Sequence, residues 1–123
     1  MNILISIGSL NTGGAEKFVV ALANELAKNN KIFIFNFSPE QNKNTVRHLI
    51  DTNIKVFDDN KLLRVVFRTL HASRLNNLIW KIKKIIFSNI LKRHNIEIVN
   101  SHLYNSDIFV AEALNKCKTP FVI

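Results

Sequence analysis

All three glycines of this 123-residue chain lie within one short stretch, SIGSLNTGGAEK. The pair Gly13 and Gly14 follows an apolar run and a short loop, and it precedes the first turn of a predicted helix. Glycine can adopt positive φ and, because it lacks Cβ, it lets a ligand approach the main chain, while the first amides of a helix are donors at its positive end. These residues therefore suit an anion or sugar-phosphate site, although a tight strand-to-helix turn would use the same pair.

Two known phosphate-binding patterns do not fit this stretch. A Walker loop requires Lys and then Ser or Thr after its second glycine, where this chain has Gly14 and Ala15. The dinucleotide fingerprint requires a second glycine at the position of Leu10. A P-loop NTPase and a dinucleotide site of that type are therefore not expected.

The elements that would position these residues alternate in type along the chain. Short runs rich in Ile, Val and Phe predict strands buried on both faces, at residues 2–8, 31–37, 54–57, 96–100 and 120–123. Segments with helical spacing lie between them. This alternation predicts an α/β fold with a parallel sheet built of right-handed crossovers. A Rossmann-like, doubly wound sheet of order 3-2-1-4-5 with helices on both faces is a common arrangement of this kind, and it is the one expected here.

His102 follows the fourth predicted strand and is the best single candidate for chemistry. In this strand order, strands one and four are neighbours, and ligands bind at the carboxyl ends where the order reverses. Gly13, Gly14 and His102 are therefore expected along one edge of the sheet. A loop histidine bonded to a main-chain carbonyl is the alternative. Glu16 falls in the first turn of the first helix, where a carboxylate either suits the helix dipole or contacts a ligand.

Composition sets further limits on the class of protein. At 14.1 kDa and 47% hydrophobic, the chain suits one globular domain over residues 1–123. No apolar run approaches the roughly 20 residues of a membrane-spanning helix, and the N-terminus lacks a signal-type segment, so a cytoplasmic location is expected. The single cysteine, Cys117, excludes an internal disulfide and is expected to be buried. It has no metal-ligand spacing around it, so no metal site is expected.

Positive charge is concentrated in one segment, which has nine Lys or Arg and no Asp or Glu between Asn60 and Ile96. Helical spacing assigns one apolar stripe of this segment to the sheet-facing core, namely Leu75, Leu78, Ile79, Ile82, Ile85, Ile86 and Ile90. A second apolar strip falls outside that stripe and is accompanied by lysines; it contains Trp80, Phe87 and Leu91, with Lys81, Lys83 and Lys84 around it. This arrangement predicts a surface helix that docks on anionic lipid. Packing of the strip against a neighbouring helix is the alternative.

Two stretches, TGGAEKFVVALANEL and IEIVNSHLYNSDIFVAEAL, resemble the glycine-rich loop, first helix and histidine-bearing loop of family 4 glycosyltransferases with the two-domain GT-B fold. The final TPFVI is similar to the next strand of that family. The resemblance covers most of the chain, but not residues 43–95. Members often carry a second histidine where this chain has Asn100, which leaves a paired-histidine role in doubt.

The resemblance implies that the chain is the N-terminal, acceptor-side half of a GT-B enzyme and that it is truncated before the donor-binding domain. A completed enzyme would be a retaining, hexosyltransferase-like enzyme of polysaccharide biosynthesis. It would transfer a sugar from a nucleotide-diphosphate sugar to a glycan or lipid-linked acceptor. The nucleotide-diphosphate sugar would be its co-substrate, and no other cofactor is expected. His102 would position the donor or acceptor, and Gly13, Gly14 and Glu16 would bind the substrate or donor phosphate. The chain alone would be inactive.

Two other functions stay open at this point. The chain could be a non-catalytic subunit that completes a split transferase together with a separate donor-domain chain. It could also be a basic module that binds nucleic acid, which the scarcity of exposed-looking aromatic residues and the lack of a recognised motif disfavour. The lipid-linked acceptors of the family and the basic segment together favour a peripheral position on the inner face of a membrane.

Overall fold

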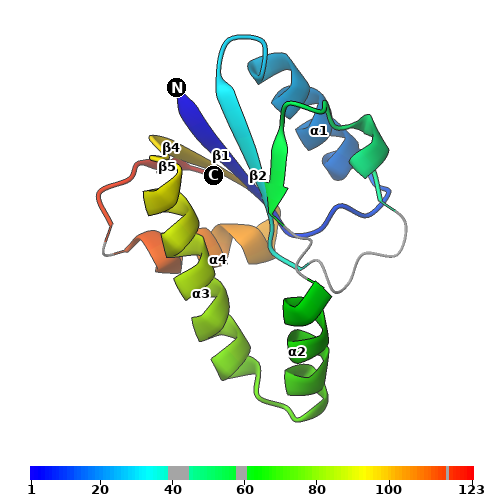
Figure 1. The fold of residues 1–123 in the computed structure, drawn as a ribbon, viewed down its shortest axis with the longest axis vertical. Helices are drawn as coiled ribbons and strands as arrows, with labels where there is room; N and C mark the ends of the chain where they lie inside the picture. The colour runs from blue at the N-terminus through cyan, green and yellow to red at the C-terminus, as the bar shows by residue number, and fades with distance from the viewer. Residues whose placement is uncertain (39–44, 58–60, 116) are drawn as a thin grey trace.

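A computed structural model of the chain describes residues 1–38, 45–57, 61–115 and 117–123 (Figure 1). Strands and helices alternate along most of it. In chain order the elements are β1 (Asn2–Ile7), α1 (Gly14–Leu26), β2 (Lys31–Asn36), the 3-10 turn η2 (Arg47–Leu49), β3 (Lys55–Phe57), α2 (Lys61–Ala72), α3 (Asn76–Arg93), β4 (Ile98–His102), α4 (Tyr104–Leu114) and β5 (Phe121–Val122).

The five strands form one parallel sheet of order β3-β2-β1-β4-β5, which confirms the predicted α/β fold and strand order. In the register of the sheet, Ile7 at the end of β1 pairs with Asn36 of β2 and with His102 of β4. The carboxyl ends of β1 and β4 therefore meet at one edge, where the chain order of the sheet reverses. β4 begins and ends two residues later than predicted, so His102 is its last residue.

Alternate residues of the central strands enter two apolar layers on opposite faces of the sheet. On one face, Ile5 and Ile34 pack with Val19, Val20 and Ala23 of α1. On the other face, the layer combines strand residues with α3 and α4; it includes Leu4, Phe33, Phe35, Val99, Phe87, Leu91, Phe109 and Val110. Helices thus cover both faces (Figure 1), as predicted, and this is why the strands are apolar almost without interruption.

The two apolar stripes predicted for α3 are only partly separated in the structure, because Ile79 and Ile90 of the predicted core stripe are buried together with Phe87 and Leu91 of the second strip. Phe87 is completely buried, whereas Leu78 and Ile85 of the predicted core stripe are 45% and 62% exposed. The reason is a set of aromatic partners: the Trp80 ring lies 5.4 Å from the rings of both Phe37 and Phe109. Helical spacing identifies the apolar residues of α3, but aromatic partners elsewhere in the sequence bring Phe87 and Trp80 to the buried side of the helix.

Of the lysines assigned to the lipid-facing strip, Lys83 belongs to the interior and Lys84 is partly exposed but paired with a carboxylate. Lys83 is 5% exposed and its Nζ donates to the main-chain oxygen of Phe37 at 2.8 Å. Lys84 Nζ lies 2.8 Å from the Glu112 carboxylate, which also accepts a hydrogen bond from Trp80 Nε1 at 2.7 Å. The predicted membrane surface is therefore wrong for Phe87 and Lys83, which are buried, whereas Lys81 is exposed. Trp80 and Lys84 both bond Glu112 and so fasten α3 to α4.

Candidate functional site

The structure brings the start of α1 and the end of β4 to the same edge of the sheet. Phe18 lies one helical turn after Gly14, and its ring meets the His102 ring edge-on, with 6.3 Å between their centroids. Gly8, which follows β1, lies beneath Leu103, the residue after His102. The residues predicted to act together, Gly13, Gly14 and His102, thus belong to adjoining segments.

The two glycines at the start of α1 do not use the backbone freedom that was predicted for them. None of the three glycines has positive φ, and Gly13, the residue that caps α1, is extended with φ −149° and ψ 172°. A Cβ on Gly14 would meet nothing within 4 Å. Gly14 therefore lies at an open surface of the first turn of α1, and the approach of a ligand to the helical amides stays a prediction.

The Glu16 side chain folds back toward Gly13 at the start of α1. A Cβ on Gly13 would collide with the Glu16 carboxylate, which turns back over the start of the helix. Ser9 Oγ donates to Glu16 Oε1 at 3.4 Å. The position of this carboxylate suits the positive end of the α1 dipole, and a contact with a ligand stays a prediction.

His102 is half-buried and hydrogen-bonded to a side chain of its own strand. Asn100 and His102 are two residues apart on β4, so they share one face of the sheet, and Asn100 Oδ1 bonds His102 Nε2. Burial lowers the pKa of His102 below its ordinary value, against the opposing effect of the Asp107 carboxylate. The ring is therefore mainly neutral at pH 7, able to accept a hydrogen bond as well as to donate one. The partner of the His102 ring is therefore a side chain, and not the main-chain carbonyl that was the alternative.

Behind His102 lies a buried chain of hydroxyl groups that the sequence reasoning missed. Ser6 Oγ of β1 lies 2.7 Å from Ser106 Oγ of α4. Ser101 Oγ lies 3.1 Å from Ser106 Oγ and donates to Asp107 Oδ1 at 2.7 Å. These contacts fasten the first turn of α4 to β1 and β4 and hold Asp107 near His102. The sequence does contain a clue to these contacts, because Ser6 and Ser101 are polar residues within two otherwise largely apolar strands.

Leu103 joins β4 to α4 in an uncommon conformation. Its φ is 75°, a region that branched and bulky residues rarely adopt. Leu103 is the N-cap of α4, and its carbonyl accepts the first hydrogen bond of that helix from the Asp107 amide at 3.0 Å. The side chains of Leu103 and Tyr104 are exposed next to His102, as is Phe18 at 62%. No residue type in the sequence signals this turn.

Among the described residues, no group of three or more His, Cys, Asp or Glu side chains could hold a metal ion. Cys117 is exposed, where a buried thiol was expected, because it follows the end of α4.

The fold defines the class of the protein as a Rossmann-like, doubly wound α/β domain. Polar residues lie at the carboxyl ends of β1 and β4, where the strand order reverses. No protein-family model matches the chain, and no curated protein matches it significantly. The resemblance to family 4 glycosyltransferases therefore rests on the quoted motifs alone.

Proposed function

We propose that this chain is the acceptor-side domain of a GT-B glycosyltransferase that uses a nucleotide-diphosphate sugar as its co-substrate. The observation that carries the proposal is the meeting of the α1 start with His102 at the carboxyl ends of β1 and β4. Doubly wound domains bind ligands at this position, where helical amides and strand-end side chains converge. The two motifs that resemble family 4 glycosyltransferases, the glycine pair at the start of α1 and His102 at the end of β4, lie on either side of the proposed site.

Each residue then has a distinct role in the proposed enzyme. The amides after Gly13 attract a phosphate or a sugar hydroxyl, and the open space at Gly14 lets that group approach. His102, neutral at pH 7, hydrogen-bonds a hydroxyl of the glycan or lipid-linked acceptor, or of the donor sugar. A donor-binding domain, in the same polypeptide or in a separate subunit, supplies the nucleotide site.

The test compares sugar transfer by the pure 123-residue chain with transfer by the chain joined to the polypeptide encoded directly after it. We expect no turnover by the chain alone and turnover by the joined protein that His102→Ala abolishes. Turnover by the chain alone, or a joined protein that is indifferent to His102→Ala, would contradict the proposal.

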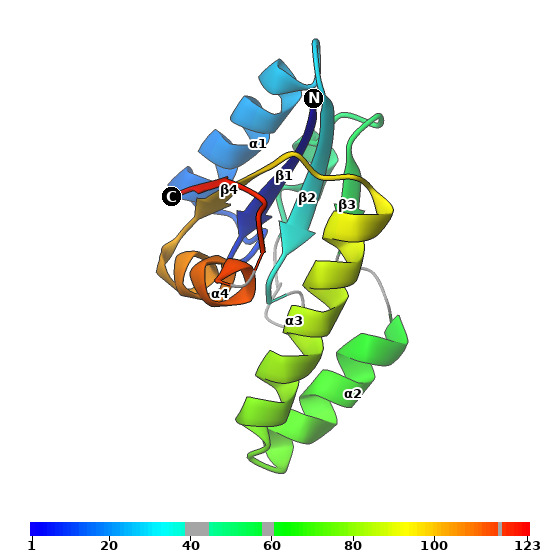
Figure 2. The same ribbon diagram turned by 90° about the vertical axis from the view of Figure 1, so that its left-hand side faces the viewer.

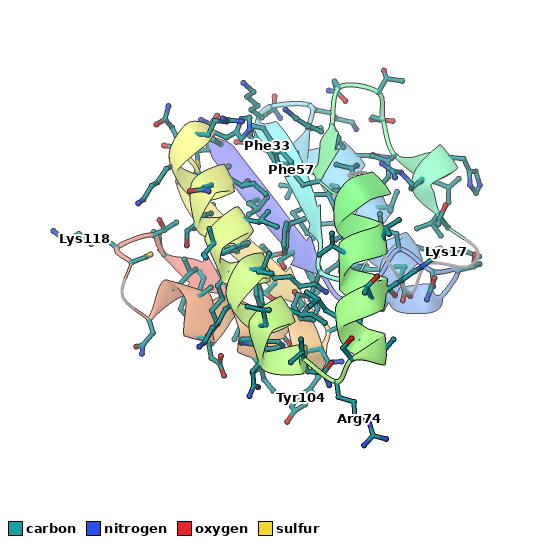
Figure 3. The ribbon with its side chains drawn as sticks, turned by 60° about the horizontal axis from the view of Figure 1, so that its bottom comes forward. Lys17, Phe33, Phe57, Arg74, Tyr104 and Lys118 are labelled. Carbon is teal, nitrogen blue, oxygen red and sulfur yellow. The ribbon has the colours of Figure 1, made fainter. Side chains whose placement is uncertain are left out.

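We also propose that the protein works at the inner face of a membrane, and that the docking surface is the hairpin of α2 and α3. This hairpin extends well beyond the sheet (Figure 2), and Arg74 lies at its far end (Figure 3). None of the described helices is long and apolar enough to cross a membrane. Any contact with lipid through the described helices would therefore be made at the surface of the bilayer.

The hairpin combines exposed apolar and basic side chains. Its exposed large apolar residues are Val65, Val66, Leu75, Leu78 and Ile85. Arg68, Arg74 and Lys81 are exposed on the same two helices and their connecting turn, and the sequence has no acidic residue between positions 60 and 96. Apolar side chains among unopposed cations suit the headgroup region of an anionic membrane. Salt-sensitive binding to nucleic acid in place of lipid would support the alternative of a nucleic-acid-binding module.

A further inference from the structure

The hydrogen bond between Asn100 and His102 determines which ring nitrogen carries the proton. The bond joins Asn100 Oδ1 to His102 Nε2. An amide oxygen can only accept a hydrogen bond, so Nε2 must be the donor. In the neutral ring the lone pair is then on Nδ1.

We propose that Asn100 is a positioning residue that selects the Nε2–H form of His102 and leaves Nδ1 to accept a hydrogen bond, or a proton, from a sugar hydroxyl. The identity of the hydroxyl rests on the proposed function, whereas the choice of tautomer does not. Asn100 acts only through His102.

The surroundings of Asn100 favour such a role. In the register of the sheet it lies between Ile5 of β1 and Val122 of β5, both apolar. A half-buried amide among apolar neighbours needs a hydrogen-bonding partner, and the His102 ring supplies one. On the α1 side, the Phe18 ring meets the His102 ring edge-on, with 6.3 Å between their centroids.

The protonated ring would keep the same bond. If Nδ1 takes a proton, Nε2–H still donates to Asn100, and the bond strengthens because its donor is now charged. Asp107 of α4, the charged group that acts on His102 in the described part of the chain, also favours the protonated form. Asp107 is held in place by Ser101 Oγ. The site can therefore accept a proton at Nδ1 without rearrangement.

The experiment measures the tautomer and the pKa of His102 by NMR of the ¹⁵N-labelled chain, with no ligand present. In the parent chain we expect Nε2 to be protonated, with an Nε2–H that exchanges slowly with water. In Asn100→Leu, which has a similar shape but no acceptor, we expect a mixture of tautomers, faster exchange and a lower pKa. In Asn100→Asp we expect a proton affinity higher by about tenfold, because a carboxylate stabilises the imidazolium.

Asn105→Asp is the matched control, since it introduces the same charge at an exposed position in the first turn of α4. It should change the His102 pKa much less than Asn100→Asp does. A protonated Nδ1 in the parent chain would overturn the proposal, as would a His102 pKa that is unchanged in both Asn100 variants while thermal unfolding shows them folded. If the tautomer is as expected but no sugar or nucleotide sugar binds, only the proposed function fails.

Discussion

The Nζ atom of Lys83 lies 2.8 Å from the main-chain oxygen of Phe37, in the buried layer between α3 and the sheet. The same ammonium lies 4.6 Å from the centroid of the Phe37 ring. A lysine expected on a membrane-facing strip thus connects α3 to the end of β2. This contact changes which lysines are available to a partner.

Lys83→Ala should lower the free energy of unfolding by about 2–3 kcal/mol, because it removes a charge-assisted hydrogen bond and leaves a buried carbonyl without that donor. Lys81→Ala, on the exposed side of the same helix, should change it by less than about 0.5 kcal/mol. Urea unfolding measures both. Equal effects of the two substitutions would show that Lys83 is not buried as described.

Replacing Arg68, Arg74 and Lys81 with glutamine should weaken binding to anionic vesicles by roughly two orders of magnitude, at about 1 kcal/mol for each cation near the lipid. Co-sedimentation is the suitable readout. Trp80 is a poor reporter, because its ring already packs on Phe37 and Phe109.

The apolar part of the same surface can be tested separately. Leu78→Glu combined with Ile85→Glu should abolish vesicle binding without unfolding the protein, since both residues are exposed. Leu49→Glu, an exposed apolar residue on η2, is the matched control and should bind as the parent does. Equal binding of the parent chain to neutral and anionic vesicles, or no binding to either, would contradict the membrane proposal.

Gly14→Val should leave the fold intact, because a Cβ there meets no other atom within 4 Å. It should also abolish sugar transfer by the completed enzyme, since the branched side chain occupies the space through which a ligand would approach the helical amides. Ala21→Val, at an exposed position later in α1, controls for the effect of a β-branched residue on the helix. If a folded Gly14→Val enzyme has unchanged kinetics, the glycine pair only forms the turn between β1 and α1 and does not bind a ligand.

His94 should make the protein less stable in mild acid. Its ring lies 4.9 Å from Phe33 and 5.2 Å from Phe57, two residues whose rings stack on each other (Figure 3). Burial lowers the pKa of His94, and the positive charges of Lys55, Lys31 and Arg93 lower it further. The unfolded chain therefore takes up this proton at a higher pH than the folded one, near 6.5.

Stability from this group is then full above about pH 6.5 and declines as the pH falls toward the lower pKa of the folded state. Thermal unfolding between pH 7.5 and 5 measures the decline. His94→Gln should make it shallower, but not remove it, because the pKa of His102 is lowered as well. His48→Gln, an exposed histidine, is the control. A decline that is the same in all three proteins would contradict this assignment.

The alternation of apolar runs and helical segments was enough to predict a parallel sheet with right-handed crossovers. The order 3-2-1-4-5, which the structure confirms, came from the common arrangement of doubly wound sheets. Local sequence was less informative about boundaries. Ile96 was placed in the fourth strand, but its amide bonds the Leu91 carbonyl at the end of α3 and its side chain fills the core there. The strand therefore starts at Ile98 and extends to His102.

The candidate site was predictable only in part. Its position followed from the strand order, and His102 was identified by its place after a strand. The bond from Asn100 follows from the pleat of a strand only once the strand is known to extend to His102. The φ of Leu103 and the exposed ring of Phe18 depend on how α4 and α1 pack, which a single sequence does not encode locally.

The central claim is that the start of α1 and the end of β4 form one sugar-phosphate site, and the most direct measurement is a ¹H–¹⁵N NMR titration of the chain with glucose 1-phosphate and, separately, mannose 1-phosphate, which need no nucleotide site. We expect saturable shifts of the amides at residues 13–18 and 100–104 with at least one of the two, and smaller shifts in Gly14→Val. Shifts confined to other segments, or no shift with either compound at millimolar concentration, would contradict the claim.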